Sequence, residues 1–154
     1  MTKILFICHG NICRSPMAEF VFKDMVEKRG LADCFHIESA ATSREEIGNQ
    51  PHYGTRKILD DLGIDYSDKR ARQIKYDDYD KFDYLIGMDT YNLRNMNRMF
   101  DNDPESKLYL LLEFAGEDGD IADPWYTNKF DTTYRDVVKG CEALLNRLME
   151  EENE

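Results

Sequence analysis

The sequence predicts an α/β fold in which helices cover both faces of a parallel sheet. Two observations lead to this prediction: short, continuous apolar runs recur along the 154-residue chain, and segments with helical apolar spacing follow them. Strands that alternate with helices in this way pair in parallel through right-handed crossovers. A chain of this length buries roughly two thirds of its unfolded surface, so residues 1–154 are expected to form one domain.

Four short runs are expected to be strands, and the first of them is too short and too continuously apolar for a helix. They are KILFIC (3–8), FHIESA (35–40), FDYLIGM (82–88) and KLYLLLEF (107–114). In such sheets ligands bind beyond the carboxyl ends of the strands. The residues that follow each run are therefore candidates for a functional site.

The first helix is expected to begin with Ser15 as its N-cap and Pro16 as its first residue, and to end at Gly30. Three further helices are expected, at 51–62, at 90–99 and from Phe130 onward. The polar segment 115–130, which contains two glycines and a proline, is predicted to be a long loop.

The charge balance excludes several classes of partner. A formal net charge of −11 argues against nucleic acid and against an anionic membrane surface, because both favour a basic face. No stretch approaches the roughly 18 apolar residues of a membrane span, and the first apolar run is too short for a secretory signal. The four cysteines are therefore expected in a reducing, cytoplasmic setting, where unusual spacing points to catalysis or metal binding.

The stretch CHGNICRS directly follows the first predicted strand and precedes the first predicted helix. A loop that enters a helix N-terminus presents unpaired backbone N–H groups, which bind an oxyanion such as phosphate. Gly10 lets the backbone bend closely, Asn11 tolerates a left-handed conformation, and Arg14 can grip two oxygens through its planar fork. Cys8 lies at the base of these donors, where the positive field favours a thiolate that can attack phosphorus. Ser15 can donate a hydrogen bond to that thiolate.

Simpler interpretations of this stretch stay open from the residues alone. A lone cysteine at a strand end is more often a small buried hydrophobe, and C-x5-R by itself arises easily by chance. Ser15 can equally be a structural helix cap. A zinc site at Cys8, His9 and Cys13 is disfavoured, because the spacing is not C-x2-C and no second ligand pair follows, so no metal is expected.

The expulsion of an alkoxide or phenoxide from phosphorus requires a proton donor. Asp123 stands in IADPWY, before Pro124, which restrains it to extended geometry. A carboxyl group beside aromatic walls and an anion favours its protonated form, as a general acid needs. Trp125 and Tyr126 can flank an aromatic substrate ring. From residue types alone, a simple turn with two half-buried aromatics is equally compatible with this stretch.

Five stretches together resemble the low-molecular-weight protein tyrosine phosphatases: CHGNICRSP near the N-terminus, SAATS (39–43), ARQI (71–74), MDTYNL (88–93) and DPWY (123–126). The likeness runs in order over nearly the whole chain. It implies a flavodoxin-like three-layer fold with a central four-stranded parallel sheet. It also implies hydrolysis of phosphotyrosine without a metal or other cofactor, with Cys8 as the nucleophile, Arg14 as the phosphate clamp and Asp123 as the general acid.

The resemblance also implies the remaining site residues. The phosphate-binding loop comprises His9, Gly10, Asn11, Ile12, Cys13, Arg14 and Ser15. Ser39 is expected to support this loop together with Asn11 and Ser15. The pocket wall is expected to contain Glu45, Trp125 and Tyr126, with His9 on an exposed rim. Cys13 matches a second loop cysteine that can form a reversible disulfide with Cys8, while Cys34 and Cys141 are expected to be structural.

Two departures from the family pattern bear on the site. Members often carry His two residues before ARQ, where this chain has Lys69, and a salt bridge from Lys69 to Asp89 is the hypothesis for its replacement. Eukaryotic relatives place an aromatic residue where this chain has SREEIG, so Glu45 or Glu46 is expected to form an acidic rim.

Two related enzyme families, and one class of protein without activity, are alternatives to this resemblance. Thioredoxin-coupled arsenate reductases add a later pair of relay cysteines, which this chain lacks between Cys34 and Cys141. Protein arginine phosphatases tend to carry Thr where this chain has Ile12, so a phosphotyrosine-containing protein is the expected partner. A catalytically idle phosphotyrosine-binding module would have lost one of the three catalytic residues, and all three are present. The chain is expected to act as a monomer or weak homodimer, with no nucleic acid and no membrane insertion.

Overall fold

The computed structural model of the chain describes residues 1–152, with the side chains described up to Glu151. Four strands form one sheet: β1 Thr2–Cys8, β2 Phe35–Ala41, β3 Tyr84–Gly87 and β4 Leu108–Leu110. The α-helices are α1 Arg14–Lys28, α2 Tyr53–Asp61, α3 Tyr76–Lys81, α4 Thr90–Met99, α5 Pro124–Thr127 and α6 Phe130–Glu152. Two short 3₁₀ helices, η1 Ala32–Cys34 and η2 Leu111–Ala115, complete the described structure.

All strand pairs are parallel, and the strand order is β2-β1-β3-β4. This is the flavodoxin-like order up to its fourth strand, and its switch point lies where β1 separates β2 from β3. The predicted α/β fold with a four-stranded parallel sheet is confirmed. Because the loops after β1, β2 and β3 leave the sheet at this one edge, they converge where a ligand is expected to bind.

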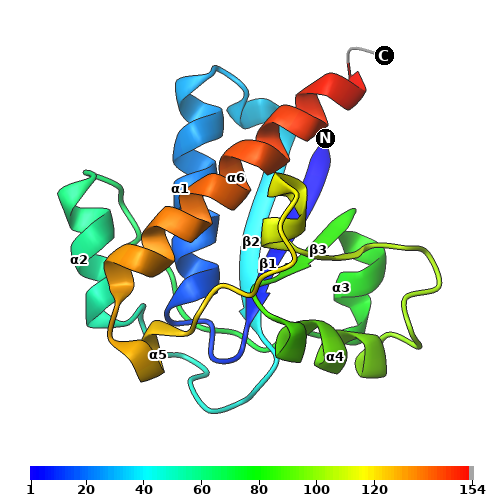
Figure 1. The fold of residues 1–154 in the computed structure, drawn as a ribbon, viewed down its shortest axis with the longest axis horizontal. Coiled ribbons are helices and arrows are strands. Elements are labelled where there is room, and N and C mark those ends of the chain that lie inside the picture. The colour runs from blue at the N-terminus through cyan, green and yellow to red at the C-terminus, as the bar shows by residue number, and fades with distance from the viewer. Residues whose placement is uncertain (153–154) are drawn as a thin grey trace.

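The alternation of side chains along β1 divides the core into two layers. Ile4 and Phe6 belong to a cluster with residues of α1, α6 and η2, while Leu5 and Ile7 belong to a cluster with residues of α3, β3 and α4. Figure 1 shows α1 and α6 on one side of the sheet and α3 and α4 on the other. Both faces of the sheet are thus buried, which is why its strands read as continuous apolar runs.

Three expectations about the elements were wrong in detail, and one helix was missed. The first helix begins at Arg14 rather than at Pro16. The run 107–114 is a strand over three residues only and then turns into η2. The segment 115–130 contains the short helix α5, and α3 was not expected at all because its sequence is mostly charged. Within residues 1–152, no helix combines the length and the hydropathy that crossing a membrane demands.

Candidate active site

The loop between β1 and α1 wraps around the sulfur of Cys8, whose exposed fraction is 3%. The backbone N–H groups of Asn11 and Ser15 donate to Sγ at 3.3 and 3.4 Å, and Ser15 Oγ lies 3.0 Å from the same sulfur. Asn11 has φ of 60°, the left-handed conformation that was expected for it. Three donors that converge on one sulfur stabilise its thiolate, and a loop of inward N–H groups also fits an oxyanion above it.

One local expectation for this loop was wrong, and the structure also gives Gly10 a specific role. Ser15 is not the N-cap of α1: Cys13 holds that position and makes no side-chain cap bond, so the Ser15 hydroxyl is left to contact Cys8. The left-handed residue of the loop is Asn11, and Gly10 keeps a φ outside the positive range. A Cβ atom at Gly10 would lie 3.3 Å from Cγ of Glu46, so glycine here provides room for the neighbouring loop.

A chain of hydrogen bonds fixes the direction of the Ser15 hydroxyl. The side-chain amide of Asn11 donates from Nδ2 to Oγ of Ser15 at 2.8 Å and to Oγ of Ser39 at 2.9 Å. An amide NH₂ group only donates, so both hydroxyls accept from it and must direct their own protons elsewhere. Ser39 donates to Oε1 of buried Glu19 at 2.6 Å, and Ser15 is left to donate to Cys8. Asn11, Ser15 and Ser39 thus lie together, as the resemblance implied.

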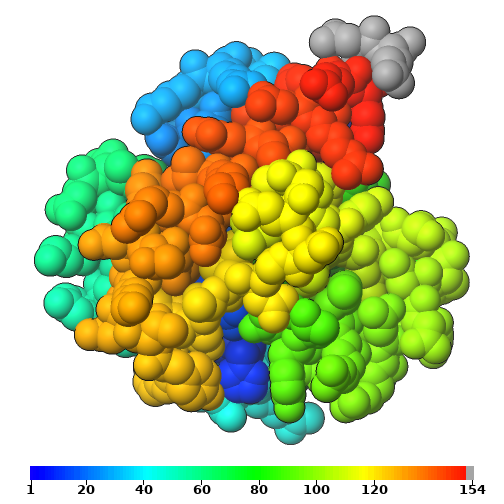
Figure 2. Space-filling view, in the orientation of Figure 1, coloured from blue at the N-terminus to red at the C-terminus, as the bar shows by residue number. Residues whose placement is uncertain are grey.

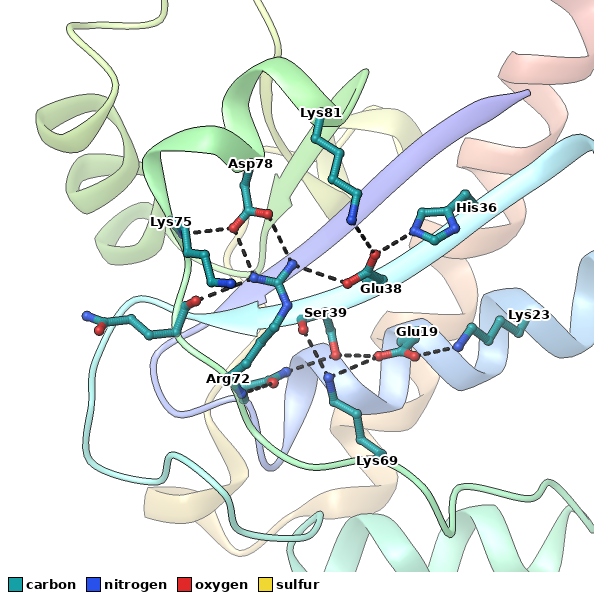
Figure 3. A network of polar contacts seen from close by, with 12 residues as sticks. Glu19, Lys23, His36, Glu38, Ser39, Lys69, Arg72, Lys75, Asp78 and Lys81 are labelled. Carbon is teal, nitrogen blue, oxygen red and sulfur yellow. Dashed lines mark hydrogen bonds and ion pairs between the residues drawn. The ribbon is translucent and has the colours of Figure 1, made fainter.

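Lys69 belongs to the same network, but the expected salt bridge to Asp89 is wrong. Its Nζ donates to the backbone carbonyl of Ser39 at 2.9 Å and lies 3.4 Å from Oε1 of Glu19 (Figure 3). Asp89 pairs with Arg14 instead. Burial lowers the pKa of Lys69, and the charge of Glu19 opposes that shift. Lys69 therefore braces the outer end of the hydrogen-bond chain rather than the phosphate clamp.

Arg72 anchors the other side of Asn11. Its backbone N–H donates to Oδ1 of Asn11 at 3.2 Å, which also fixes which end of the amide is the acceptor. Its guanidinium lies between Asp78, at 3.0 and 3.2 Å, and Glu38, at 3.3 Å (Figure 3). Burial by itself raises the pKa of Glu38, but hydrogen bonds from His36 and Lys81 and the charge of Arg72 lower it to about 2.

Arg14 is 2% exposed and is held along one edge of its guanidinium. Nη1 donates to Oδ2 of Asp89 at 2.6 Å and to the carbonyl of Ile121 at 2.9 Å, and Nη2 lies 3.5 Å from Oδ2 of Asp123. Nε is buried and has no hydrogen-bond partner within residues 1–152. The Nε–Nη2 edge, the one that grips two oxygens side by side, is therefore open to an anion. Burial alone lowers the pKa of Arg14, but the charge of Cys8 and the hydrogen bond to Asp89 outweigh it and raise that pKa.

Asp89 is the functional residue whose role the sequence reasoning assigned wrongly. It follows β3 and caps α4, where its Oδ1 accepts from the backbone N–H of Asn92 at 2.8 Å while Oδ2 holds Arg14. One signal was available: β3 ends beside β1 in a parallel sheet, so the residues after both strands meet at the same edge. That signal alone would have placed Asp89 near Arg14.

A pocket opens above the loop and gathers the expected wall residues. It is lined by Cys8, His9, Gly10, Ile12, Cys13, Arg14, Glu45, Glu46, Asp123, Trp125 and Tyr126. Trp125 and Tyr126 are 57% and 81% exposed, and His9 Nε2 lies 3.0 Å from Oε2 of Glu45 at the rim. In Figure 2 the blue N-terminal segment lies in a hollow between the orange segment around α5 and the green segment around α4. The pocket thus joins apolar, aromatic walls to an acidic rim.

Asp123 reaches this pocket through a cap of its own. Its Oδ1 accepts from the backbone N–H of Trp125 at 3.0 Å as the N-cap of α5, with Pro124 as the first helical residue. The other oxygen, Oδ2, faces Nη2 of Arg14. A carboxyl group at the mouth of the anion cradle can exchange a proton with a group bound there.

Cys13 lines the pocket and is 5% exposed. Burial, followed by the charges of Cys8 and Asp123, raises the pKa of its thiol. All four cysteines are unbridged in the structure. Cys141 is buried in the core and Cys34 is partly buried beside it, where both serve as packing groups.

The fold and this cradle together define a class of protein: an α/β enzyme that acts on phosphate groups. The model of the family described as "Low molecular weight phosphotyrosine protein phosphatase" matches residues 3–154. The chain belongs to this family and is a low molecular weight protein-tyrosine-phosphatase, which confirms the resemblance read from its motifs.

Individual relatives agree with this assignment. The low molecular weight protein-tyrosine-phosphatase YfkJ of Bacillus subtilis (strain 168) is 41% identical over 154 residues, which cover 98% of each chain. A crystal structure of YfkJ has a TM-score of 0.94 over 98% of this chain and 96% of that chain. The low molecular weight protein tyrosine phosphatase SP-PTP from Streptococcus pyogenes is 47% identical, with a TM-score of 0.88 over 99% of this chain and 97% of that chain. DARP, a Drosophila arginine phosphatase, is 32% identical, with a TM-score of 0.87 over 96% of this chain and 98% of that chain.

Proposed function

We propose that this phosphatase hydrolyses phosphotyrosine monoesters of proteins without a metal ion, through a phosphocysteine intermediate on Cys8. One observation carries the proposal: three donors converge on Cys8 Sγ in a pocket that Arg14 also lines, and Nε of Arg14 has no hydrogen-bond partner within residues 1–152. A phosphate in this cradle has its phosphorus in line with the sulfur and its equatorial oxygens against the loop N–H groups. Phosphoryl transfer then needs positioning and charge stabilisation more than covalent assistance.

In the first step the thiolate of Cys8 forms a bond to phosphorus as the bond from phosphorus to the tyrosyl oxygen breaks. Asp123 gives its proton to that oxygen, so tyrosine leaves as a neutral phenol. Arg14 and the loop N–H groups hold the equatorial oxygens throughout, and Ser15 stabilises the sulfur.

In the second step a water molecule attacks phosphorus as the P–S bond breaks. The carboxylate of Asp123 takes the proton from this water, and the Cys8 thiolate is released with its hydrogen bond from Ser15 intact. Inorganic phosphate leaves, and Asp123 is again protonated for the next cycle.

The pocket supports an aromatic phosphoester as the substrate class. The pocket offers a phenyl ring apolar walls, formed by Ile12, Trp125 and Tyr126. A phenyl ring between these walls is long enough for its phosphate group to reach Cys8. The likeness to an arginine phosphatase and the acidic rim of Glu45 and Glu46 support phosphoarginine as the second candidate. The apolar side chain of Ile12 favours phosphotyrosine. The partner is a phosphotyrosine-containing protein in a reducing cytoplasm, which keeps the Cys8 thiol available, and the acting species is a monomer or weak homodimer.

Steady-state turnover of p-nitrophenyl phosphate, a phosphotyrosine peptide and a phosphoarginine peptide, all with EDTA, tests this proposal. We expect the wild type to hydrolyse the first two, Cys8→Ser to abolish both activities, and Cys34→Ser, as a matched cysteine control, to retain them. Asp123→Ala is expected to reduce turnover of the peptide by about 10² to 10⁴-fold. It should reduce turnover of p-nitrophenyl phosphate less, because nitrophenolate leaves without a proton.

Two results would refute the mechanism. Turnover that EDTA abolishes would require a metal, and turnover that survives Cys8→Ser would require another nucleophile. A preference for the phosphoarginine peptide would keep the mechanism and replace the substrate class.

A further inference from the structure

A second groove adjoins the catalytic pocket on the side of α4. It runs between α4, the start of α3 and the segment that follows β2, and His9 lines both the pocket and the groove. The backbone N–H of Thr42 donates to the carbonyl of Cys8, and that of Ser43 to the carbonyl of His9, each at 3.0 Å. The wall of the groove is thus hydrogen-bonded to the catalytic loop, so anything bound there has a fixed position relative to Cys8.

The groove has a buried apolar floor and exposed aromatic sides. Ile74 and Met96 form the floor, with exposed fractions of 6% and 1%, whereas Tyr76 and Tyr91 on the sides are 73% and 67% exposed. Met99 adds a flexible, polarizable side chain to the lining. Folding alone does not favour large apolar side chains that stay exposed to water around an apolar floor. Their clustering here therefore indicates a surface that binds another molecule.

The charge of the groove differs from that of the chain as a whole. None of the residues that line it is acidic, although the chain carries 31 Asp and Glu residues, and Arg98 lines it directly. Arg94 lies with its guanidinium carbon 5.6 Å from the centre of the Tyr91 ring and adds a second positive charge nearby. Glu45 and Glu46 line the catalytic pocket instead. The acidic rim of the catalytic pocket and the basic groove beside it therefore carry opposite charge.

We propose that this groove binds the polypeptide segment next to the phosphotyrosine of the substrate, with an apolar side chain between Tyr76 and Tyr91 and a carboxylate at Arg98. The proposal rests on the proposed function, because the phosphotyrosine in the pocket anchors the segment. The groove continues from the pocket through His9, so a chain that leaves the pocket on this side enters it directly. The preferred substrate is then a protein whose phosphotyrosine is followed or preceded closely by apolar and acidic residues.

The test compares kcat and KM for p-nitrophenyl phosphate with those for phosphotyrosine peptides that carry Leu and Glu, or Leu and Lys, on either side of the phosphotyrosine. We expect the Leu–Glu peptide on one side to be the best substrate. Tyr91→Ala and Arg98→Ala should each lower kcat/KM for it about tenfold through KM, while p-nitrophenyl phosphate turnover stays within twofold. Tyr53→Ala is the matched control, since Tyr53 is 65% exposed and lies on α2, away from the groove.

Charge reversal sharpens the result. Arg98→Glu should disfavour the Glu peptide and favour the Lys peptide, because the charge that faces the peptide has changed sign. Equal effects of the groove variants on the peptide and on p-nitrophenyl phosphate would overturn the proposal, as would a wild-type dimer that Tyr91→Ala dissociates in sedimentation. If the wild type hydrolyses none of these substrates, the proposed function itself is refuted, and this inference with it.

Discussion

Replacement of Asp89 by Asn isolates the electrostatic support of the phosphate clamp. The Asp89 side chain has two separate contacts: Oδ1 accepts from Asn92 N–H at 2.8 Å as the cap of α4, and Oδ2 accepts from Arg14 Nη1 at 2.6 Å. Asparagine keeps an oxygen that can accept the cap hydrogen bond, but it places an NH₂ group where the second oxygen was. This NH₂ group and the Arg14 guanidinium are both hydrogen-bond donors and cannot pair. The variant therefore removes the ion pair while it leaves the helix cap in place.

The size of the effect follows from the burial of the pair. The Arg14 and Asp89 side chains are 2% and 19% exposed, and loss of one partner from a buried ion pair costs about 3–5 kcal/mol. Arg14 keeps the Ile121 carbonyl and gains a stronger pull from Asp123, so we expect a loss of about 2–4 kcal/mol in the free energy of unfolding. For a chain of this size that loss lowers Tm by roughly 5–15 °C.

Activity should fall for a different reason. Without Asp89, the Arg14 guanidinium turns toward Asp123, and its Nε–Nη2 edge no longer faces the loop. A misplacement of about 1 Å costs up to about 10²-fold in rate, so we expect kcat/KM for p-nitrophenyl phosphate to fall by about that factor. The inhibition constant of inorganic phosphate should rise in parallel, because it reports the same oxygen contacts without any chemical step.

Asp120→Asn is the matched control for this experiment. Asp120 accepts from the backbone N–H and the hydroxyl of Thr90 at 2.9 and 2.8 Å, so it supports the same end of α4 without contact to Arg14. We expect it to lose some stability and to keep its phosphate inhibition constant. If Asp89→Asn retains both the phosphate inhibition constant and kcat/KM within threefold, the clamp does not depend on this ion pair and the reasoning fails.

Three further predictions concern the surroundings of the site. Peroxide should inactivate the wild type reversibly, since it oxidises Cys8 to its sulfenic acid, which condenses with the Cys13 thiol and releases water. In Cys13→Ser no thiol traps the sulfenic acid, so further peroxide oxidises it to sulfinic acid, which dithiothreitol does not reduce, and the variant should recover much less activity; equal recovery by the variant and the wild type would exclude this disulfide. Lys69→Met should destabilise the fold by about 1–3 kcal/mol, because it removes a partner from buried Glu19, and it should lower kcat modestly. If the thermal melts and the p-nitrophenyl phosphate kinetics of the variant match those of the wild type, Lys69 does not support the site. The pKa of Glu38 is lowered to about 2 in the folded protein, so its carboxylate stabilises the fold above its unfolded pKa of about 4.3. In urea titrations the stability advantage of the wild type over Glu38→Gln should therefore shrink from pH 4 to pH 2. A difference that stays constant over this range would contradict the prediction.

The sequence alone determined the α/β class, the order of the four strands along the chain and the loop that wraps around Cys8. Strands buried on both faces must be continuous apolar runs, and a loop from strand to helix must expose backbone donors, so both features are readable locally. The three-residue length of β4 and the charged helix α3 were not readable, because tertiary contacts rather than residue preferences decide them. The start of α1 at Arg14 falls within the uncertainty that any boundary prediction carries.

What surrounds the loop was decided by the tertiary structure. Asp89, after β3, and Ile121 and Asp123, in the segment before α5, come from two distant parts of the chain to hold one guanidinium. Glu19, Ser39 and Lys69 meet behind Asn11 only because β2 pairs with β1 beside α1. The spacing of residues in the sequence does not predict these contacts, because a lysine can pair with any nearby carboxylate among 31 acidic residues. The cysteine and the arginine of the site therefore lie in one short loop that the sequence reveals, whereas Asp123 and the partners that orient the loop depend on how the sheet brings distant segments to a single edge.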